Sequence, residues 1–360
     1  MLAPMKRTPR LPSIVLVTLT LACLSGCSSV AYYSQAIAGQ TSILLGRQPL
    51  ETVIKDPATS PDVADKLRLI QELRAFASAE LKLPVDDAYA TYVDTGRDFV
   101  VWNVFAAPEF SLRMKTFCYP VAGCVSYRGY FAEADAARFA GELADEGYDV
   151  FVGGVAAYST LGWFADPVLN TFVRRSRRDL AALIFHELAH RAVYLKGDTT
   201  FNESFATAVA EVGVSRWLGE SDASLDVARY AAQRERRASV LALIGETRTA
   251  LTRLYAREDL DPEGKRAAKA AEIQRLRQRY GELRETWSGH RDFAAWMASD
   301  LNNARLGTVA DYNSLVPAFH QLLADNGGDL VAFYTAVQSL ADLEESSRRA
   351  AIDELVARSR

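Results

Sequence analysis

Cysteine and histidine are scarce in this chain, with four of each among 360 residues, so the spacing between them carries information. Long apolar runs are scarcer still: residues 14–24 form one run of about 11 residues, against the roughly 20 that span a bilayer. No segment gathers a dense basic stripe and the formal net charge is −4, which disfavours nucleic acid as a partner. The 49% of hydrophobic residues supplies a full core and excludes general disorder, and the single short apolar run excludes a polytopic membrane protein.

The first 27 residues have the order of a bacterial export signal. Three basic residues precede the apolar run, and the run ends in Leu-Ser-Gly-Cys at positions 24–27. A cysteine at the cleavage point resembles a lipobox, so we expect residues 1–26 to be removed and Cys27 to carry lipid, with a buried N-terminal helix as the alternative. Ser28 resembles the signal for onward sorting. The expected location is therefore the periplasmic side of the membrane, lipid-anchored, and the outer membrane rather than the inner one.

Two cysteines remain once Cys23 leaves with the signal and Cys27 takes the lipid. These are Cys118 and Cys124, which bracket a turn that contains proline and glycine. In an oxidising compartment this pair predicts a small disulfide-closed loop. Two unpaired buried thiols are the alternative, whereas a metal site built from two cysteines alone would lack ligands.

The residue pattern divides the chain into a sheet region set between helices. Helical period is found in residues 32–45 and 62–81, and β-branched and aromatic residues dominate residues 89–130. The predicted fold class is α+β, mainly helical, with a small mixed or antiparallel sheet. Further along we expect a helix at 132–145, a strand at 150–161, and helices at 174–195 and 202–218. We expect one domain over 27–360, made of a helix and sheet part at 62–172, a metal-site pair of helices at 174–218, a helical hairpin at 221–287 and C-terminal helices at 288–360.

Two long helices with heptad spacing flank a polar segment at residues 259–264. The apolar positions are Val240, Ile244, Thr247, Leu251 and Leu254 on the first helix and Ile273, Leu276, Tyr280, Leu283 and Trp287 on the second. This pattern predicts an antiparallel helical hairpin. Its many Arg and Glu residues indicate solvated faces, with a surface for an envelope protein partner as the second interpretation.

Residues 186–190, His-Glu-Leu-Ala-His, match the HExxH motif. Because residues four apart share a helix face, the imidazoles of His186 and His190 can bind one zinc ion. Glu187 lies beside them and can accept a proton from zinc-activated water, as the hydrolysis of a carbonyl compound requires. The alternative is two surface histidines one turn apart, which an apolar helix disfavours.

A catalytic zinc ion normally takes three protein ligands, so one more is needed. We expect Glu203, at the start of the next helix, because a helix that follows a tight loop folds back onto the first and small neighbours such as Ser204 allow close approach. Glu211, two turns further on, and Asp198 are candidates to hydrogen-bond a ligand histidine. An ordinary salt bridge of Glu211 is the alternative.

Hydrolysis also needs a donor to the oxyanion that develops on the substrate. Tyr312 is our candidate, ahead of His290 and His320, although each of these residues could be an ordinary half-buried side chain.

The strand expected at 150–161 could pair with an extended peptide, since Gly153 and Gly154 allow close approach of another backbone. The aromatic residues that could line an apolar subsite beside it are Tyr158, Trp163 and Phe164. An interior strand with a bulge at the glycines is the alternative.

Four segments match those of a known protein family. They are YYSQAIAGQ at 32–40, YSTLGWFADPVLNTF at 158–172, HELAHRAVYLKGDTTFNESFA at 186–206 and NNARL at 302–306. On these segments the chain resembles the bacterial predicted aminopeptidase family of lipoproteins, within the glutamate-zincin group of metallopeptidases. The resemblance implies a zincin-like fold, zinc ligands His186, His190 and Glu203, and a catalytic Glu187. It also implies aminopeptidase activity. The chain departs from the best-known glutamate zincins at the third ligand, because His190 and Glu203 are closer in sequence than the corresponding residues there.

An aminopeptidase must meet the free ammonium group of its substrate with a carboxylate, for which Asp166 and Glu109 are candidates. We therefore expect a zinc-dependent peptidase, an aminopeptidase by resemblance, that hydrolyses peptides in the periplasm. The alternatives are a zinc endopeptidase and a non-catalytic lipoprotein scaffold that holds a structural zinc ion and binds a partner through the helical hairpin. Glu187 argues against the scaffold, because a structural zinc site needs no base.

Overall fold

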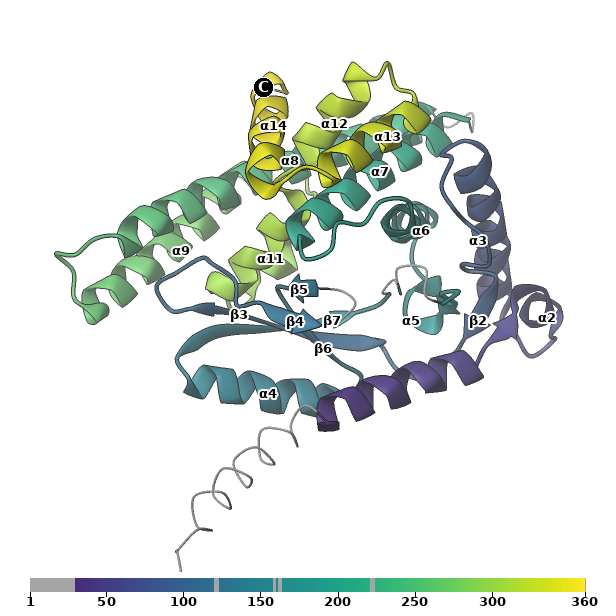
Figure 1. Cartoon of the computed structure of the whole chain (residues 1–360), viewed down its shortest axis with the longest axis horizontal. Helices are drawn as coiled ribbons and strands as arrows, with labels where there is room; N and C mark the ends of the chain where they lie inside the picture. The colour runs from purple at the N-terminus through teal and green to yellow at the C-terminus, as the bar shows by residue number, and fades with distance from the viewer. Residues whose placement is uncertain (1–29, 120–122, 158–159, 161–163, 221–223, 360) are drawn as a thin grey trace, which may run out of the picture. The chain divides into compact units, whose positions relative to one another are not determined.

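The computed structural model describes residues 30–119, 123–157, 160, 164–220 and 224–359. The chain divides into two compact units, Met1–Gly46 and Arg47–Arg360. The described part of the first unit contains a helix over residues 30–45, close to the predicted 32–45. All other helices and strands belong to the second unit, whose ribbon is shown in Figure 1.

The central sheet of the second unit has the strand order β6-β3-β7, with both pairs antiparallel. Its strands are β6 (Arg128–Tyr130), β3 (Val101–Pro108) and β7 (Tyr148–Val155). Among the described strands, β7 pairs only with β3, so it is the edge strand that the sequence predicts. It ends at Val155 rather than at residue 161, because its partner β3 begins at Val101, which is paired with Val155.

Two smaller sheets complete the β structure. One is mixed: β2 (Thr91–Val93) pairs antiparallel with β1 (Gln48–Pro49) and parallel with β8 (Val168–Leu169). The other is the hairpin of β4 (Phe117–Tyr119) and β5 (Gly123–Val125). The predicted fold class is confirmed: the chain is α+β and mainly helical, with small mixed and antiparallel sheets before the HExxH helix.

Four described helices of this unit precede the HExxH motif in the sequence: α2 (Leu50–Lys55), α3 (Pro61–Ala79), α4 (Glu133–Asp145) and α5 (Asn170–Val173). The helix α6 (Arg177–Ala192) carries the HExxH motif and is followed by α7 (Thr199–Glu220). The first turn of α6 is capped by Ser176, whose hydroxyl accepts a hydrogen bond from the backbone N–H of Asp179 at 3.1 Å. This cap explains why α6 begins three residues later than the sequence pattern suggests.

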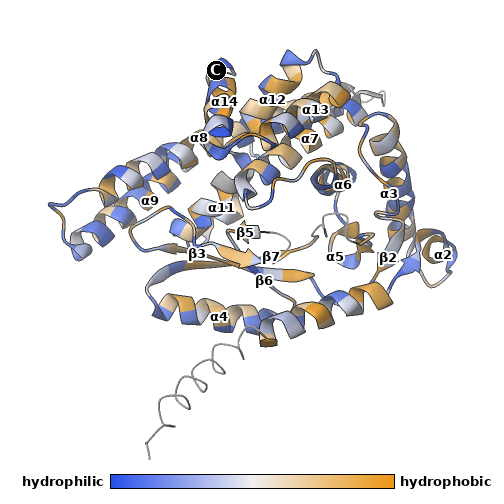
Figure 2. Ribbon diagram, in the orientation of Figure 1, coloured by the Kyte–Doolittle hydropathy of each residue, from blue (hydrophilic) through white to orange (hydrophobic). Residues whose placement is uncertain are grey.

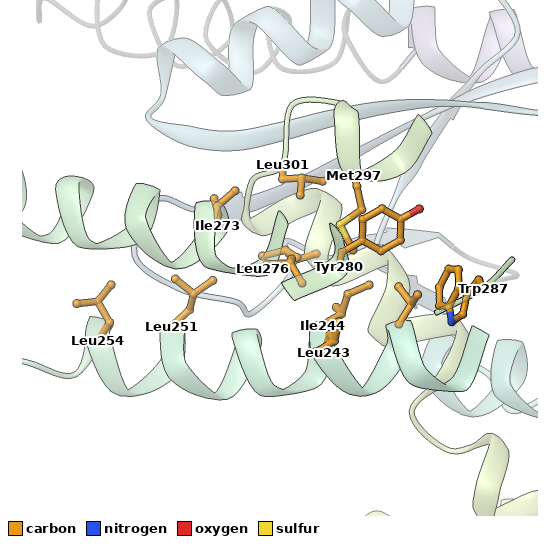
Figure 3. Close-up of a cluster of buried hydrophobic side chains, with 12 residues drawn as sticks. Leu243, Ile244, Leu251, Leu254, Ile273, Leu276, Tyr280, Trp287, Met297 and Leu301 are labelled. Carbon is orange, nitrogen blue, oxygen red and sulfur yellow. The ribbon is translucent and has the colours of Figure 1, made fainter. Parts of the chain in front are cut away.

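The predicted helical hairpin is formed by α8 (Ser224–Tyr255) and α9 (Pro262–Glu285). Figure 3 shows Leu251 and Leu254 of α8 turned towards Ile273 and Leu276 of α9. Of the ten heptad positions named from the sequence, only Leu283 is partly rather than fully buried. Figure 2 shows many hydrophilic residues along α9, as expected of solvated faces.

The short helices α10 (Ala294–Ala298) and α11 (Asn303–Asn313) follow the hairpin. They pack against its core through Met297 and Leu306, together with Leu301 from the connection between them. The chain ends in α12 (Val316–Asp325), α13 (Leu330–Ala341) and α14 (Glu345–Arg358). Within the described residues, no helix is both long and apolar enough to cross a membrane.

The segment NNARL binds α11 to the central sheet and to the hairpin. The Asn302 side chain donates to the carbonyl of Val150 at 2.9 Å, and the backbone N–H of Asn303 donates to the carboxylate of Asp149 at 2.8 Å. Tyr255 of α8 donates to the Asn303 side-chain oxygen at 2.8 Å, and Asn303 is fully buried. This segment therefore has a structural role, because a buried amide must find partners for its polar atoms.

Candidate metal centre

Helices α6 and α7 bring together His186, His190 and Glu203. Each residue offers one donor atom, and the three atoms lie within 4.8 Å of one another. The Glu203 Oε2 atom is 3.1 Å from Nε2 of His186 and 3.7 Å from Nε2 of His190. The two imidazole rings are nearly perpendicular, at 87°, with centroids 4.9 Å apart. The structure thus gathers the three residues that the sequence predicts as ligands.

The position of Glu203 depends on a tight loop between the two helices. Helix α6 ends because Val193 adopts an extended conformation. The side chain of Asn202, which is 2% exposed, then holds Leu195 twice: it accepts from the backbone N–H at 2.8 Å and donates to the carbonyl at 2.7 Å. Asp198 accepts from the backbone N–H of Phe201 at 2.9 Å, which caps α7. Glu203 is therefore in the first turns of α7, facing α6.

The β4–β5 hairpin lies against this loop. A side chain at Gly123 would come within 2.8 Å of Lys196 Cγ and 3.0 Å of the Gly197 nitrogen, and both glycines have positive φ angles. Cys118 and Cys124, paired across the hairpin, form a disulfide in the structure, the pairing that the sequence predicts. The close approach of Gly123 to Lys196 and Gly197 explains why glycine is needed at position 123.

Glu187 lies on α6 between the two histidines and is 8% exposed. Burial raises the pKa of its carboxyl group, the two neighbouring histidines lower it, and the carboxylates of Glu203 and Asp166 raise it further. The net effect is a raised pKa. Burial also raises the pKa of Glu203, but the adjacent histidines outweigh it and lower that pKa to about 2. Two carboxyl groups in one site thus have opposite shifts.

The donor set fits a catalytic divalent cation. Two imidazoles and one carboxylate form the His₂Glu set that hydrolytic zinc sites use. Nδ1 of His190 is buried and has no hydrogen-bond partner among the described residues. Its opposite ring nitrogen, Nε2, is the atom that faces Glu203.

Asp166 belongs to the surroundings of Glu187 and is 5% exposed. Its carboxylate accepts hydrogen bonds from the hydroxyl of Thr160 at 2.7 Å and from the Thr160 backbone N–H at 3.1 Å. Burial raises the pKa of Asp166, against the effects of the Thr160 hydrogen bonds and of Arg191. Of the two candidate acids for a substrate ammonium group, this one is electrostatically coupled to the centre.

Glu109, the other candidate, is engaged elsewhere. Its carboxylate accepts two hydrogen bonds from Arg266 of α9, at 2.5 and 3.0 Å. These hydrogen bonds lower the pKa of Glu109, with burial opposing them. The residue therefore joins the sheet side of the molecule to the helical hairpin.

Glu211 and Asp198 make contacts other than the predicted one to a ligand histidine. Glu211 forms an ion pair with Arg234 at 3.0 Å and meets Nε2 of His320 at 2.8 Å. This is the salt-bridge alternative. Asp198 caps α7 and is 3.8 Å from Arg348.

Several predicted substrate residues cannot be placed in the same way. Tyr158, Trp163 and the side chain of Tyr312 lie outside the described part of the structure, and Phe164 is 44% exposed. On β7, the ring of Phe99 occupies the space beside Gly154, where a side chain would come within 2.5 Å of it. The close approach at Gly154 is thus made by a residue of this chain.

Tyr89 is a neighbour of the centre that sequence reasoning missed. It is 2% exposed, its φ angle is +57°, and its hydroxyl has no hydrogen-bond partner among the described residues. Burial raises its pKa well above the usual range, and the charges of Glu187 and Asp166 add to the effect. No local pattern marks this tyrosine, because its place depends on a backbone hydrogen bond to the carbonyl of Asp166 at 2.6 Å.

Two imidazoles, a carboxylate and a buried glutamate beside them form a set suited to metal-assisted hydrolysis. The comparison with protein families agrees with this class. A family model with the description "Putative aminopeptidase" matches residues 31–352, and the chain belongs to that family. No curated protein and no solved structure matched the chain. The family membership supports a peptidase.

Proposed function

We propose that the protein is a zinc-dependent aminopeptidase, exported and anchored by lipid at Cys27, that hydrolyses peptides on the periplasmic side of the membrane. The observation that carries the proposal is the cluster of His186, His190 and Glu203 with Glu187 next to it on α6. The family match supports the peptidase part. The proposal goes beyond the family match in naming zinc as the metal, an exopeptidase specificity and a periplasmic location.

The three ligand residues would hold the ion between α6 and α7. A bound zinc ion supplies a Lewis acid that polarises a carbonyl group and lowers the pKa of water. Glu187 takes a proton from the attacking water and later gives it to the nitrogen of the leaving amine, so the peptide bond breaks with no net change at the glutamate. Tyr312 remains our candidate donor to the oxyanion.

Substrate binding is assigned to β7 and the segment that follows it. An extended peptide would add to the edge of β7 that is paired with no described strand, beside Gly153 and Gly154, with Tyr158 at the adjoining subsite. Asp166 would accept the free ammonium group of the substrate. A blocked N-terminus would remove the positive charge that Asp166 attracts, which costs binding free energy.

The base is tested by Glu187→Gln, which keeps the shape of the side chain and removes its basicity. We expect turnover of a mixed-peptide substrate to fall roughly 10²- to 10⁴-fold while zinc content stays at the wild-type level. Glu142→Gln, an exposed glutamate on α4, is the matched control and should keep both. Wild-type turnover in Glu187→Gln would show that Glu187 is not the base, and absence of turnover in the wild-type protein would favour the scaffold with a structural zinc ion.

The specificity is tested with one peptide in free and N-acetylated forms. We expect cleavage of the free form only, with release of the first amino acid. Asp166→Asn should raise KM for the free peptide and reduce the preference for it. Cleavage deep inside the acetylated peptide would identify an endopeptidase instead.

A further inference from the structure

The helix at residues 30–45 exposes an unusual amount of apolar side chain. Val30 is 67% exposed, Tyr33 43%, Ile37 65% and Leu45 83%. These are four of the eight large hydrophobic side chains that are exposed among the described residues. Their separations of three, four and eight residues place them on one face of the helix. An exposed apolar face of this kind marks an interaction site, because binding removes its apolar area from water.

The same helix carries no charge. The sequence has no Lys, Arg, Asp or Glu between Cys27 and Gly46, and the exposed polar residues of the helix are serines and a threonine. Helices that bind acidic or basic protein surfaces need charged residues, and this one has none to offer. An uncharged face with a tyrosine among aliphatic side chains suits the boundary between lipid headgroups and acyl chains.

The chain that precedes the helix favours the same partner. The predicted lipid site Cys27 is three residues before Val30, so a lipid at that site would hold the start of the helix within about 11 Å of the membrane surface. A face held so close meets lipid at high effective concentration. No helix of the described residues can span the membrane, so the helix could lie along the surface but not cross it.

We propose that the helix at residues 30–45 is a membrane-surface helix, which lies in the headgroup region of the bilayer with Val30, Tyr33, Ile37 and Leu45 inserted. The inserted face gives the chain a second contact with the membrane, in addition to the proposed lipid at Cys27, and fixes the orientation of the helix at the surface. Since it lacks basic residues, its binding depends on apolar burial and not on anionic lipids.

Depth in the bilayer is measured with spin labels on the full lipidated chain in vesicles of phosphatidylethanolamine and phosphatidylglycerol. Tyr33→Cys and Ile37→Cys supply the label sites, one at a time, and Val331→Cys on α13 is the control, because Val331 is another exposed aliphatic residue, at 56%. We expect the first two labels to gain collisions with oxygen and lose collisions with a water-soluble nickel complex. Collision rates equal to those of the control would overturn the proposal.

Binding without the lipid is measured by vesicle flotation. The Cys27→Ser variant is exported with a non-lipoprotein signal peptide in place of its own, so that it carries no lipid and the Cys118–Cys124 disulfide can form. We expect it to float with the vesicles, with the same partitioning at low and high salt and with or without phosphatidylglycerol. Ile37→Asp should weaken partitioning about tenfold, because it removes one apolar anchor and adds a charge, whereas Val331→Asp should not.

Two outcomes would contradict lipid as the occupant of the face. If Ile37→Cys labels broaden one another and dimers form without vesicles, the face binds a second copy of the chain. If the unlipidated chain stays off vesicles of every composition, the face does not bind lipid. Both results overturn the proposal, and neither depends on peptidase activity.

Discussion

The helix pair α6–α7 and the helix pair α8–α9 have the same plan, two successive helices joined by a short connection, but opposite interiors. Between α6 and α7 the buried residues include Glu187, His190, Asn202 and Ser204. The interior of α8–α9 is an apolar seam. Its buried polar side chain Thr247 donates a hydrogen bond from its hydroxyl to the carbonyl of Leu243 in the same helix. Buried ionisable groups cost free energy unless they are paired. The buried polar groups of the first pair therefore cost stability but can serve catalysis, whereas the apolar seam of the second pair stabilises the fold.

The largest expected effect separates the two acidic residues of α7. Glu203→Ala removes one of the three proposed ligands, so zinc affinity should fall on the order of 1000-fold or more. Glu211→Ala, eight residues along the same helix, breaks the ion pair with Arg234 and the hydrogen bond with His320, and should leave zinc affinity nearly unchanged while it lowers stability. Metal competition titrations on both variants measure this. The reverse order would assign the third ligand to Glu211.

The second prediction concerns the apolar pair. Leu276 is 1% exposed in the seam shown in Figure 3. Leu276→Ala should lower the free energy of unfolding by about 2–5 kcal/mol, because it removes buried methyl groups and leaves a cavity. Zinc affinity should stay at the wild-type value. A parallel loss of zinc affinity, measured on the folded protein, would show that the two helix pairs are not independent.

The third prediction returns to the loop between the ligand helices. Asn202→Ala removes both hydrogen bonds to Leu195, so Glu203 loses its fixed position and zinc affinity should fall about 10- to 100-fold. Asn313→Ala is the matched control, since its amide hydrogen-bonds Val309 and Arg237 rather than the metal loop. Equal zinc affinities in the two variants, despite similar losses in Tm, would mean that Asn202 stabilises the fold only.

The two helix pairs also differ in what the sequence could reveal. The seam of α8–α9 repeats along the chain, so ten positions named from spacing are buried or partly buried there. HExxH is similarly local, because one helical turn fixes both histidines. The place of Glu203 near a helix start predicts that it joins them, and in the structure its carboxylate lies 3.1 Å from His186.

Contacts between distant segments were not accessible in this way. Tyr89 reaches the centre through the carbonyl of Asp166, and Glu109 pairs with Arg266, 157 residues away. The strand β7 is shorter at its C-terminal end than its sequence predicts for the same reason, since it ends where its partner β3 begins. Periodicity describes one element at a time, whereas these features depend on which elements meet.

The smallest expected effect tests the connection between the hairpin and the rest of the unit. Glu109→Gln breaks the ion pair with Arg266, but Arg266 is 57% exposed at its side chain, so solvent screens the pair and the loss should be about 0.2–1 kcal/mol. The pH dependence has a definite sign. Because Arg266 lowers the pKa of Glu109 in the folded protein, the contribution is complete above the ordinary glutamate pKa and disappears as the pH falls through the lowered value. Denaturant unfolding of both proteins at neutral and acidic pH measures the difference, which should shrink towards zero in acid. A difference that persists after Glu109 is protonated would come from packing rather than from charge.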